Sequence, residues 1–217
     1  SQLGMKTAIV ERESLGGICL NWGCIPTKAL LRSAEVLHLA KTASAYGLKV
    51  DKADFDLDGV VKRSRGVAAQ LSGGVKHLMT KNKITVIEGD ARLEKGGDAP
   101  KVIVKDAKGT DSAYQAQHVL LATGARARAI PQAGLEPDGK LVWTYREAMV
   151  PDEMPKRLLV IGSGAIGIEF ASFYNELGSE VTVVEAVNRI LPAEDAEISA
   201  FAHKSFEKQG LIIKTGA

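Results

Sequence analysis

The chain has 217 residues, with 28 Lys and Arg side chains against 26 Asp and Glu, so its net charge is +2. This length allows one or two domains with a sizeable core, and the near balance of charge argues against a dedicated nucleic-acid-binding protein. No apolar run reaches the roughly 18 residues that a membrane span needs, so we expect no insertion into a membrane.

The beginning of the chain carries a pattern that returns near its end. Residues 3–11 read "LGMKTAIVE", and residues 177–185 read "LGSEVTVVE". In both stretches a Leu-Gly pair precedes a short β-rich run that ends in Val-Glu. We interpret them as two copies of one supersecondary unit, with a chance match of a common helix–Gly–strand pattern as the alternative. On this interpretation the chain starts inside the first helix of its first unit, and about 20 residues of that unit lie upstream.

Both cysteines lie in the stretch "GGICLNWGCIPTK", residues 16–28. If Cys19 and Cys24 shared one undistorted helix, their Cα atoms would lie ~8.6 Å apart, whereas a disulfide needs less than ~7 Å. The glycines fit a loop that bends, and Pro26 marks a helix start that favours the thiolate form of Cys24. The pattern favours a reversible dithiol/disulfide, with two buried structural thiols as the alternative. Two cysteines in one motif favour a reducing compartment over a secreted disulfide scaffold.

Two helices are expected after the cysteine motif. The first runs from Pro26 to about residue 46, where Gly47 closes it. The second covers residues 58–82 and is interrupted at Gly73 and Gly74. We expect a solvated face for its basic residues, which are Lys62, Arg63, Arg65, Lys76 and Lys81.

Strands and a linker are expected in the middle of the chain. Residues 84–88, 101–105 and 118–124 read as strands, and residues 105–110 supply a turn. The proline-containing region 129–157 reads as a linker between two domains.

The second copy of the repeat shows what the unit is. An apolar run over residues 158–161 predicts a buried parallel strand, and Gly162, Gly164 and Gly167 follow in G-x-G-x-x-G spacing. In this pattern the first glycine permits a tight turn, the second lets the backbone approach a pyrophosphate, and the third lets helix and strand pack closely. Glu185 ends the next strand, at a spacing that suits a hydrogen bond to a ribose 2′-hydroxyl.

A helix is expected between these two strands, ended by Gly178. Its apolar face is formed by four residues spaced 4, 3 and 4 apart, which are Ile166, Phe170, Phe173 and Leu177. In the first unit Glu11 takes the place that Glu185 takes in the second. The chain therefore carries two nucleotide sites, which indicates a flavin together with a nicotinamide.

The expected fold class is α/β, with two Rossmann-like dinucleotide-binding units that have parallel sheets and a β-meander between them. We expect an FAD-binding domain over residues 1–150, without its first strand and glycine loop, and the first part of an NAD-binding domain over residues 151–217.

Three motifs resemble those of the flavin-dependent pyridine nucleotide–disulfide oxidoreductases. The cysteine stretch resembles the redox-disulfide motif of the family, "LLATG" at 120–124 its second flavin motif, and "VIGSGAIGIEFA" with "VTVVE" its nicotinamide-binding unit. Within the family, the NAD-using branch that oxidises dihydrolipoamide fits best. Relatives that use the 2′-phosphorylated nucleotide place arginines after this strand, whereas Glu185 of this chain would repel the phosphate. Those relatives also tend to carry Ala at the position of Gly167 and Tyr at the position of Ala165.

The resemblance implies roles at matching positions. Cys19 would meet the substrate, and Cys24 would lie against the flavin as a thiolate that forms a charge-transfer pair. Lys28 would approach the flavin ring and pair with Glu169 near the nicotinamide. Implied cofactor-binding positions are Glu11, Gly16, Gly17, Cys19, Lys28, Thr123, Gly124 and Ala125 toward FAD, and Gly162, Gly164, Ala165, Ile166, Gly167, Glu169 and Glu185 toward NAD. No metal site is expected.

The resemblance also implies an activity and its partners. The enzyme would oxidise a lipoyl group on an acyltransferase or carrier protein of a 2-oxo acid dehydrogenase or glycine cleavage complex, and reduce NAD⁺. It would act as a homodimer in the cytoplasm, or in the mitochondrial matrix of a eukaryote, without nucleic acid or membrane. The alternatives are a glutathione- or mercuric-reductase-like flavoprotein and a non-catalytic nucleotide-binding fragment.

A catalytic His-Glu pair, which the family carries in a C-terminal interface domain, has no counterpart in the chain. His38, His77 and His118 are expected to be ordinary helix or strand residues, and His203 to form a surface pair with Glu207. We therefore expect the 217 residues alone to be inactive and the sequence to represent an enzyme incompletely, with a true fragment as the alternative.

Overall fold

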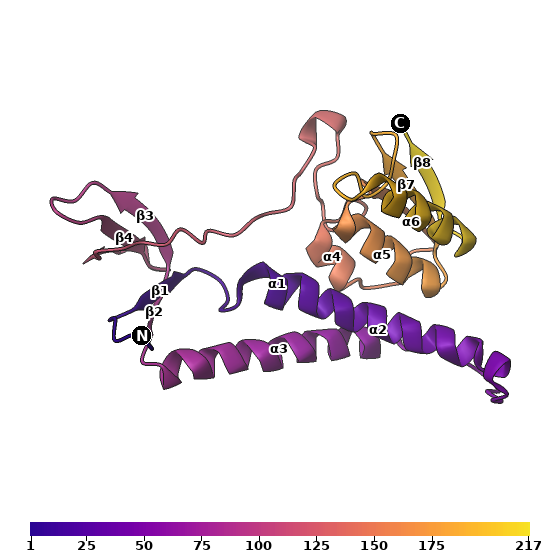
Figure 1. Ribbon diagram of the computed structural model, residues 1–217, viewed down its shortest axis with the longest axis horizontal. Coiled ribbons are helices and arrows are strands. Elements are labelled where there is room, and N and C mark those ends of the chain that lie inside the picture. Colours follow the sequence, from indigo (N-terminus) through magenta and orange to yellow (C-terminus); the bar gives the residue numbers. More distant parts are fainter. The chain divides into compact units, whose positions relative to one another are not determined.

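Two units make up the structure of residues 1–217, a computed structural model shown in Figure 1. The first unit consists of Ser1–Asn21 and Ala68–Arg126, and the second of Trp22–Val67 and Ala127–Ala217. The long helix α3, Leu57–Lys81, contributes to both. None of the helices combines the length and the apolar character that crossing a bilayer requires.

The first unit contains a parallel strand pair. Strand β1, Ala8–Glu11, runs parallel to β2, Thr85–Glu88, with Ala8 opposite Thr85 and Glu11 opposite Glu88. Parallel pairing brings the carboxyl ends of both strands to the same edge, which is where nucleotides bind in sheets of this kind. Strand β2 confirms the strand predicted at residues 84–88.

The first unit also contains the predicted antiparallel meander. It consists of β3 (Asp90–Glu94), β4 (Lys101–Lys105) and β5 (Asp111–Gln115), with β4 in the centre. The central strand is the one predicted at 101–105, and its Ile103 and Val104 are buried. The predicted turn follows it, because one oxygen of the Asp106 carboxylate accepts hydrogen bonds from the backbone N–H groups of Lys108 and Thr110.

The strand predicted at residues 118–124 is wrong. Residues 116–129 form neither helix nor strand, and Leu120 is 90% and Leu121 71% exposed. An apolar, β-branched run becomes a strand only where the edge of another strand offers its N–H and C=O groups, and none of the strands in the chain pairs with this segment.

Helix α3 corrects two further expectations. It runs without interruption through Gly73 and Gly74, because each helical Gly costs only ~1 kcal/mol relative to Ala and the neighbouring turns propagate cooperatively. Its basic residues are not all solvated: Arg63 donates to the Ala29 carbonyl at 2.8 Å, and Arg65 lies half-buried against an indole ring.

The second unit is built on a parallel sheet. Strands β6 (Arg157–Ile161), β7 (Glu180–Glu185) and β8 (Ile212–Thr215) pair in this order. Helices α5 (Ala165–Glu176) and α6 (Ala196–Lys208) connect them, and Figure 1 shows both helices beside β7 and β8. Strands that alternate with helices in a parallel sheet are the Rossmann arrangement. The predicted α/β fold class is confirmed.

The burial pattern of this unit departs from the prediction at two places. The apolar run at 158–161 is not buried on both faces, because Leu159 is 58% and Ile161 49% exposed while Leu158 and Val160 face α5 and the core. Phe170 and Phe173 of α5 and Leu177, which follows it, are buried as predicted, but Ile166 is 64% exposed and Ile168 takes its place. Gly178 follows with φ +106, which confirms the glycine that ends the helix.

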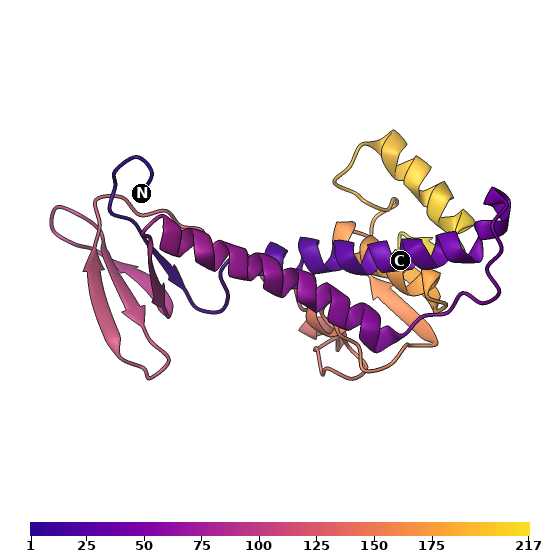
Figure 2. The ribbon, with the colours of Figure 1, turned by 90° about the horizontal axis from the view of Figure 1, so that it is seen from below.

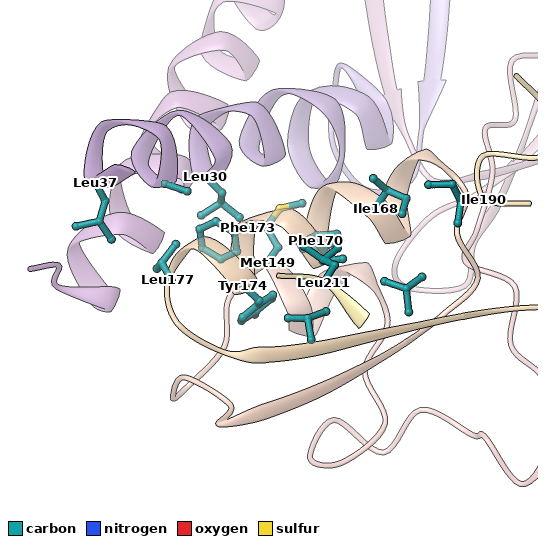
Figure 3. Close-up of a cluster of buried hydrophobic side chains, with 14 residues drawn as sticks. Leu30, Leu37, Met149, Ile168, Phe170, Phe173, Tyr174, Leu177, Ile190 and Leu211 are labelled. Atoms are coloured by element: carbon teal, nitrogen blue, oxygen red, sulfur yellow. The ribbon is translucent and has the colours of Figure 1, made fainter. Parts of the chain in front are cut away.

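The core of the second unit lies between α5 and α2, Cys24–Lys41 (Figure 3). Leu30 and Leu37 of α2 pack toward Phe173 of α5 and Leu177, the residue that follows α5. Figure 2 shows α2 running beside the first part of α3. Helix α2 starts two residues before the predicted Pro26 and ends at Lys41. A 3-10 turn, η1 (Ala43–Tyr46), continues it to Gly47, whose φ of +73 confirms the expected end.

The region predicted as a linker, residues 129–157, is partly structured. It contains the 3-10 turn η2, Pro131–Ala133, and the short helix α4, Tyr145–Met149. Thr144 and Glu147 form a capping box at the start of α4, so two backbone N–H groups have side-chain partners. Met149 is fully buried, and the Tyr174 hydroxyl donates to the Ala148 carbonyl at 2.7 Å, which ties α4 to the core.

We predict that Leu30→Ala lowers the free energy of unfolding of the second unit by about 2–4 kcal/mol, because it removes a buried side chain and leaves a cavity between α2 and α5. Leu39→Ala, on the same helix at a side chain that is 42% exposed, should cost less than ~1 kcal/mol. Denaturant titrations of both variants measure this, and equal losses would contradict the assigned core.

Candidate active site

A disulfide joins Cys19 and Cys24 across a break between two helices. Cys19 lies in α1, Gly17–Trp22, and Cys24 is the first residue of α2. Gly23 separates the helices with φ −147 and ψ −121, far from helical values. The break solves the distance problem of a continuous helix. The expectation that an undistorted helix is excluded is confirmed, although Cys19 lies in a short helix and not in a loop.

Asn21 holds the backbone before the first cysteine, and sequence reasoning missed this residue. Its buried side chain donates to the carbonyls of Leu15 at 3.0 Å and Gly17 at 2.9 Å. The Ser72 hydroxyl donates to the same Leu15 carbonyl at 3.2 Å. Gly16 and Gly17 have φ of +92 and +63, so the chain turns here in a way that side chains disfavour. In the sequence, the only indication of this role is that an asparagine side chain stands about one helical turn after Gly17.

Lys28 and Glu169 form an ion pair between α2 and α5. Lys28 lies four residues, and thus about one turn, after Cys24 on the same helix. The Lys28 side chain is 63% exposed and that of Glu169 28%, so the pair stands at the edge of the core and not within it. A lysine that the family resemblance places beside a flavin is therefore held by a carboxylate from the nucleotide-binding unit.

The glycine-rich loop after β6 has the geometry that close helix–strand packing requires. A Cβ atom on Gly167 would lie 2.1 Å from the carbonyl oxygen of Gly162 and 3.2 Å from Val160 Cγ1. Gly162 has a φ of +96, which the tight turn needs. Gly164 is the N-cap of α5, and a Cβ there would meet nothing within 4 Å. The loop thus leaves open space at a helix N-terminus, which fits a pyrophosphate.

Glu185 is fixed at the carboxyl end of β7. Its Oε2 accepts hydrogen bonds from the backbone N–H of Ser163 at 2.9 Å and from the Ser163 hydroxyl at 2.6 Å. These two bonds, the hydroxyl first, hold the pKa of Glu185 below its ordinary value. A charged carboxylate at the strand end, beside the glycine loop, is suited to accept a hydrogen bond from a ribose hydroxyl.

The first unit has the corresponding carboxylate. Glu11 ends β1, and its Oε1 accepts from the N–H groups of Glu13 at 2.8 Å and Ser14 at 3.3 Å. Thr123, Gly124 and Ala125, expected near the flavin, are exposed in the segment that forms no strand. Glu11 is thus fixed at the end of a strand, whereas Thr123, Gly124 and Ala125 lie in a segment that forms neither helix nor strand.

Two of the four histidines form surface contacts, and His118, expected in a helix or strand, lies in a segment that forms neither. His203 Nε2 lies 3.4 Å from Glu207 on α6, and His38 Nδ1 lies 3.1 Å from Glu176 of α5. No group of three or more His, Cys, Asp or Glu residues is arranged to hold a metal ion.

The parallel sheet with its glycine loop defines a dinucleotide-binding protein, and the disulfide at the start of α2 adds thiol–disulfide chemistry to it. The chain belongs to the pyridine nucleotide-disulphide oxidoreductase family, whose sequence pattern matches residues 1–217.

Individual relatives agree with this assignment. The chain is 56% identical to the dihydrolipoyl dehydrogenase of Rhizobium etli, with 100% of the chain and 47% of that protein covered, and 54% identical to that of Zymomonas mobilis, with 99% and 45% covered. Among solved structures, LpdA of Mycobacterium tuberculosis has a TM-score of 0.89 at 28% identity, with 99% of the chain and 46% of LpdA covered. The flavoprotein disulfide reductase RclA of Escherichia coli has a TM-score of 0.75 at 27% identity, with 100% and 44% covered. The chain thus spans about half the length of the relatives it matches.

We predict that Ser163→Ala raises the pKa of Glu185 toward its ordinary value, because the largest bond to its charged form is lost. A depressed carboxyl pKa stabilises the fold above the unfolded-state pKa, and this contribution disappears as the pH falls through the folded-state value. In the variant the contribution is smaller, so the gain in stability with rising pH across the acid range should also be smaller.

Carboxyl NMR titration measures the pKa. Ser179→Ala, which removes another buried hydroxyl, should leave Glu185 unchanged, and an unshifted Glu185 in Ser163→Ala would contradict the assignment.

Proposed function

We propose that the full-length protein oxidises protein-bound dihydrolipoamide to lipoamide and reduces NAD⁺ to NADH, through the Cys19–Cys24 disulfide and a bound FAD. The observation that carries the proposal is the disulfide itself, closed over a helix break with Cys24 at the first position of an 18-residue helix. Two relatives that are more than half identical and cover nearly the whole chain bear the name dihydrolipoyl dehydrogenase.

The thiol chemistry follows from the positions of the two sulfurs. One substrate thiolate attacks Cys19 Sγ, the Cys19–Cys24 bond breaks, and Cys24 leaves as a thiolate at the N-terminus of α2, where free N–H groups and the helix dipole stabilise it. The second substrate thiol loses its proton and attacks the substrate sulfur of the mixed disulfide, which releases Cys19 and forms lipoamide. The protein then holds the electron pair that the substrate has lost.

FAD and NAD would complete the reaction, since when bound they supply electron transfer from the dithiol and hydride transfer to NAD⁺. We assign residues 1–150 to an FAD-binding domain and residues 151–217 to part of an NAD-binding domain. In the first, Glu11, Gly16 and Gly17 would hold the adenosine and pyrophosphate, and Thr123, Gly124 and Ala125 would close on the flavin. In the second, Gly162, Gly164, Ala165, Ile166, Gly167 and Glu185 would hold NAD.

Lys28 and Glu169 would act together in this scheme. The ion pair fixes the position of the Lys28 ammonium one turn beyond Cys24, and a fixed cation favours negative charge on the flavin ring and on the thiolate. The carboxylate of Glu169 compensates the lysine and lies on α5, whose N-terminus would face the nicotinamide nucleotide. In this arrangement the ion pair would hold the Lys28 ammonium in place, and no proton would have to move to or from the lysine.

Partners and setting follow from the same assignment. The substrate would be a lipoyl group on an acyltransferase or carrier protein of a 2-oxo acid dehydrogenase or glycine cleavage complex. We propose a homodimer in the cytoplasm, or in the mitochondrial matrix if the source is eukaryotic, with the catalytic base donated by a part of the protein outside these 217 residues.

We predict that the flavin-loaded full-length protein reduces NAD⁺ with dihydrolipoamide, and that NADP⁺ is used more than about a hundredfold less well. The reason is that Glu185, held ionised by Ser163, opposes a 2′-phosphate, and like charges in contact cost several kcal/mol. Steady-state kinetics with both nucleotides measures the preference. Preference for NADPH together with glutathione disulfide or mercuric ion as acceptor would overturn the proposal.

We also predict opposite spectra for the two cysteine variants. In the flavin-loaded protein, Cys24→Ser should abolish the long-wavelength absorbance band that two-electron reduction produces, because the thiolate that faces the flavin is gone. Cys19→Ser is the matched control, since it breaks the same disulfide but leaves the Cys24 thiolate, and it should show the band without reduction. A band that survives in Cys24→Ser would refute the assigned roles.

A further inference from the structure

The carbonyl oxygen of Leu15, just before the redox motif, accepts hydrogen bonds from the side chains of two different helices. The Asn21 amide of α1 donates to it at 3.0 Å, and the Ser72 hydroxyl of α3 donates to it at 3.2 Å. All three residues belong to the first unit. Asn21 is buried and Ser72 half-buried, and a hydrogen bond is stronger where water is excluded. Two helices therefore hold this carbonyl in place.

These bonds also fix the direction of a backbone N–H group. A trans peptide group is planar, and its N–H points away from its C=O. Holding the Leu15 carbonyl therefore aims the N–H of Gly16, which belongs to the same peptide group and donates to no group of the chain. The Asn21 amide holds the Gly17 carbonyl as well, at 2.9 Å. The two glycines, with φ of +92 and +63, are thus kept in one arrangement.

Cys19 lies within the segment that Asn21 spans. It is two residues after Gly17 and two before Asn21, so the bond from the Asn21 amide to the Gly17 carbonyl closes the turn of α1 that carries it. Closing a disulfide fixes the backbone on both sides, and fixing a free residue costs conformational entropy. A segment that is already held makes closure more favourable, because the reacting group is pre-organised.

We propose that Asn21 and Ser72 are positioning residues that couple flavin binding to closure of the Cys19–Cys24 disulfide, because both hold the Leu15 carbonyl. They act through the backbone and not by contact with the flavin or the substrate. The effect on flavin binding rests on the proposed function, which assigns the glycine pair to the flavin pyrophosphate. The effect on the disulfide does not depend on that assignment.

The test uses the full-length protein freed of FAD, with two measurements. Titration with FAD, followed by the quenching of flavin fluorescence, gives the affinity. Equilibration with mixtures of reduced and oxidised dithiothreitol, read by alkylation and mass, gives the fraction of the disulfide that is closed. Ser72→Ala removes one of the two donors, so it should weaken FAD binding about three- to tenfold and shift the thiol equilibrium toward the dithiol about threefold.

Three further variants separate positioning from folding. Asn21→Asp places a carboxylate oxygen against two carbonyl oxygens and should weaken FAD binding more than about tenfold. Ser72→Thr keeps the hydroxyl and should stay within twofold of the parent protein in both measurements. Ser64→Ala is the matched control on the same helix: its buried hydroxyl donates to the Val61 carbonyl of α3 at 3.0 Å, and its loss should change neither measurement.

The proposal is overturned if Ser72→Ala stays within twofold of the parent protein in either measurement, if Ser64→Ala shifts as far, or if Ser72→Thr behaves like Ser72→Ala. Should Asn21→Asp fail to fold, the serine variants decide. A parent protein that binds no FAD would contradict the proposed function, and the disulfide equilibrium, which needs neither FAD nor lipoamide, would then decide the role of Ser72. The two failures are therefore distinguishable.

Discussion

A disulfide between two cysteines that are separated by four residues is the constraint on which the rest of the site depends. No continuous helix brings such a pair within bonding distance, so the chain breaks at Gly23 and starts α2 at Cys24. That start sets the position of every later residue of the helix: Lys28 comes one turn after Cys24, and Leu30 and Leu37 face the core. The redox pair, the lysine and the packing of the second unit are thus consequences of one helix beginning at one residue.

Helix α5 carries the other half of the arrangement. Its N-terminus follows the glycine loop, Glu169 in its first turns pairs with Lys28, and Phe173 further along packs against α2. A rigid helix that is anchored in the core therefore holds both the nucleotide loop and the ion pair. Since α5 and α2 share a buried interface, the loop and the Cys24 end of α2 belong to one packed body within the second unit.

Sequence reasoning predicts best where backbone geometry demands a residue type. The spacing of Gly162, Gly164 and Gly167 predicts a tight turn and close packing that the structure contains. Sequence reasoning predicts least where the structure of a segment depends on which other segment of the chain packs or pairs with it. The run around Leu120 has strand composition but pairs with no strand, and Ile161 lies on a sheet face that no helix covers. Arg65 reads as a solvated residue because nothing local reveals that Trp22 lies beside it.

The central claim is that Cys19 and Cys24 form one disulfide that opens and closes while the fold persists. The most direct test is to denature the purified protein in the presence of an alkylating reagent, with and without prior treatment with dithiothreitol, and to measure intact mass. The account predicts no label without dithiothreitol, two labels after it, and recovery of the unlabelled state on reoxidation with an unchanged far-ultraviolet circular dichroism spectrum. Two labels on the untreated protein, or a disulfide that joins two chains, would contradict it.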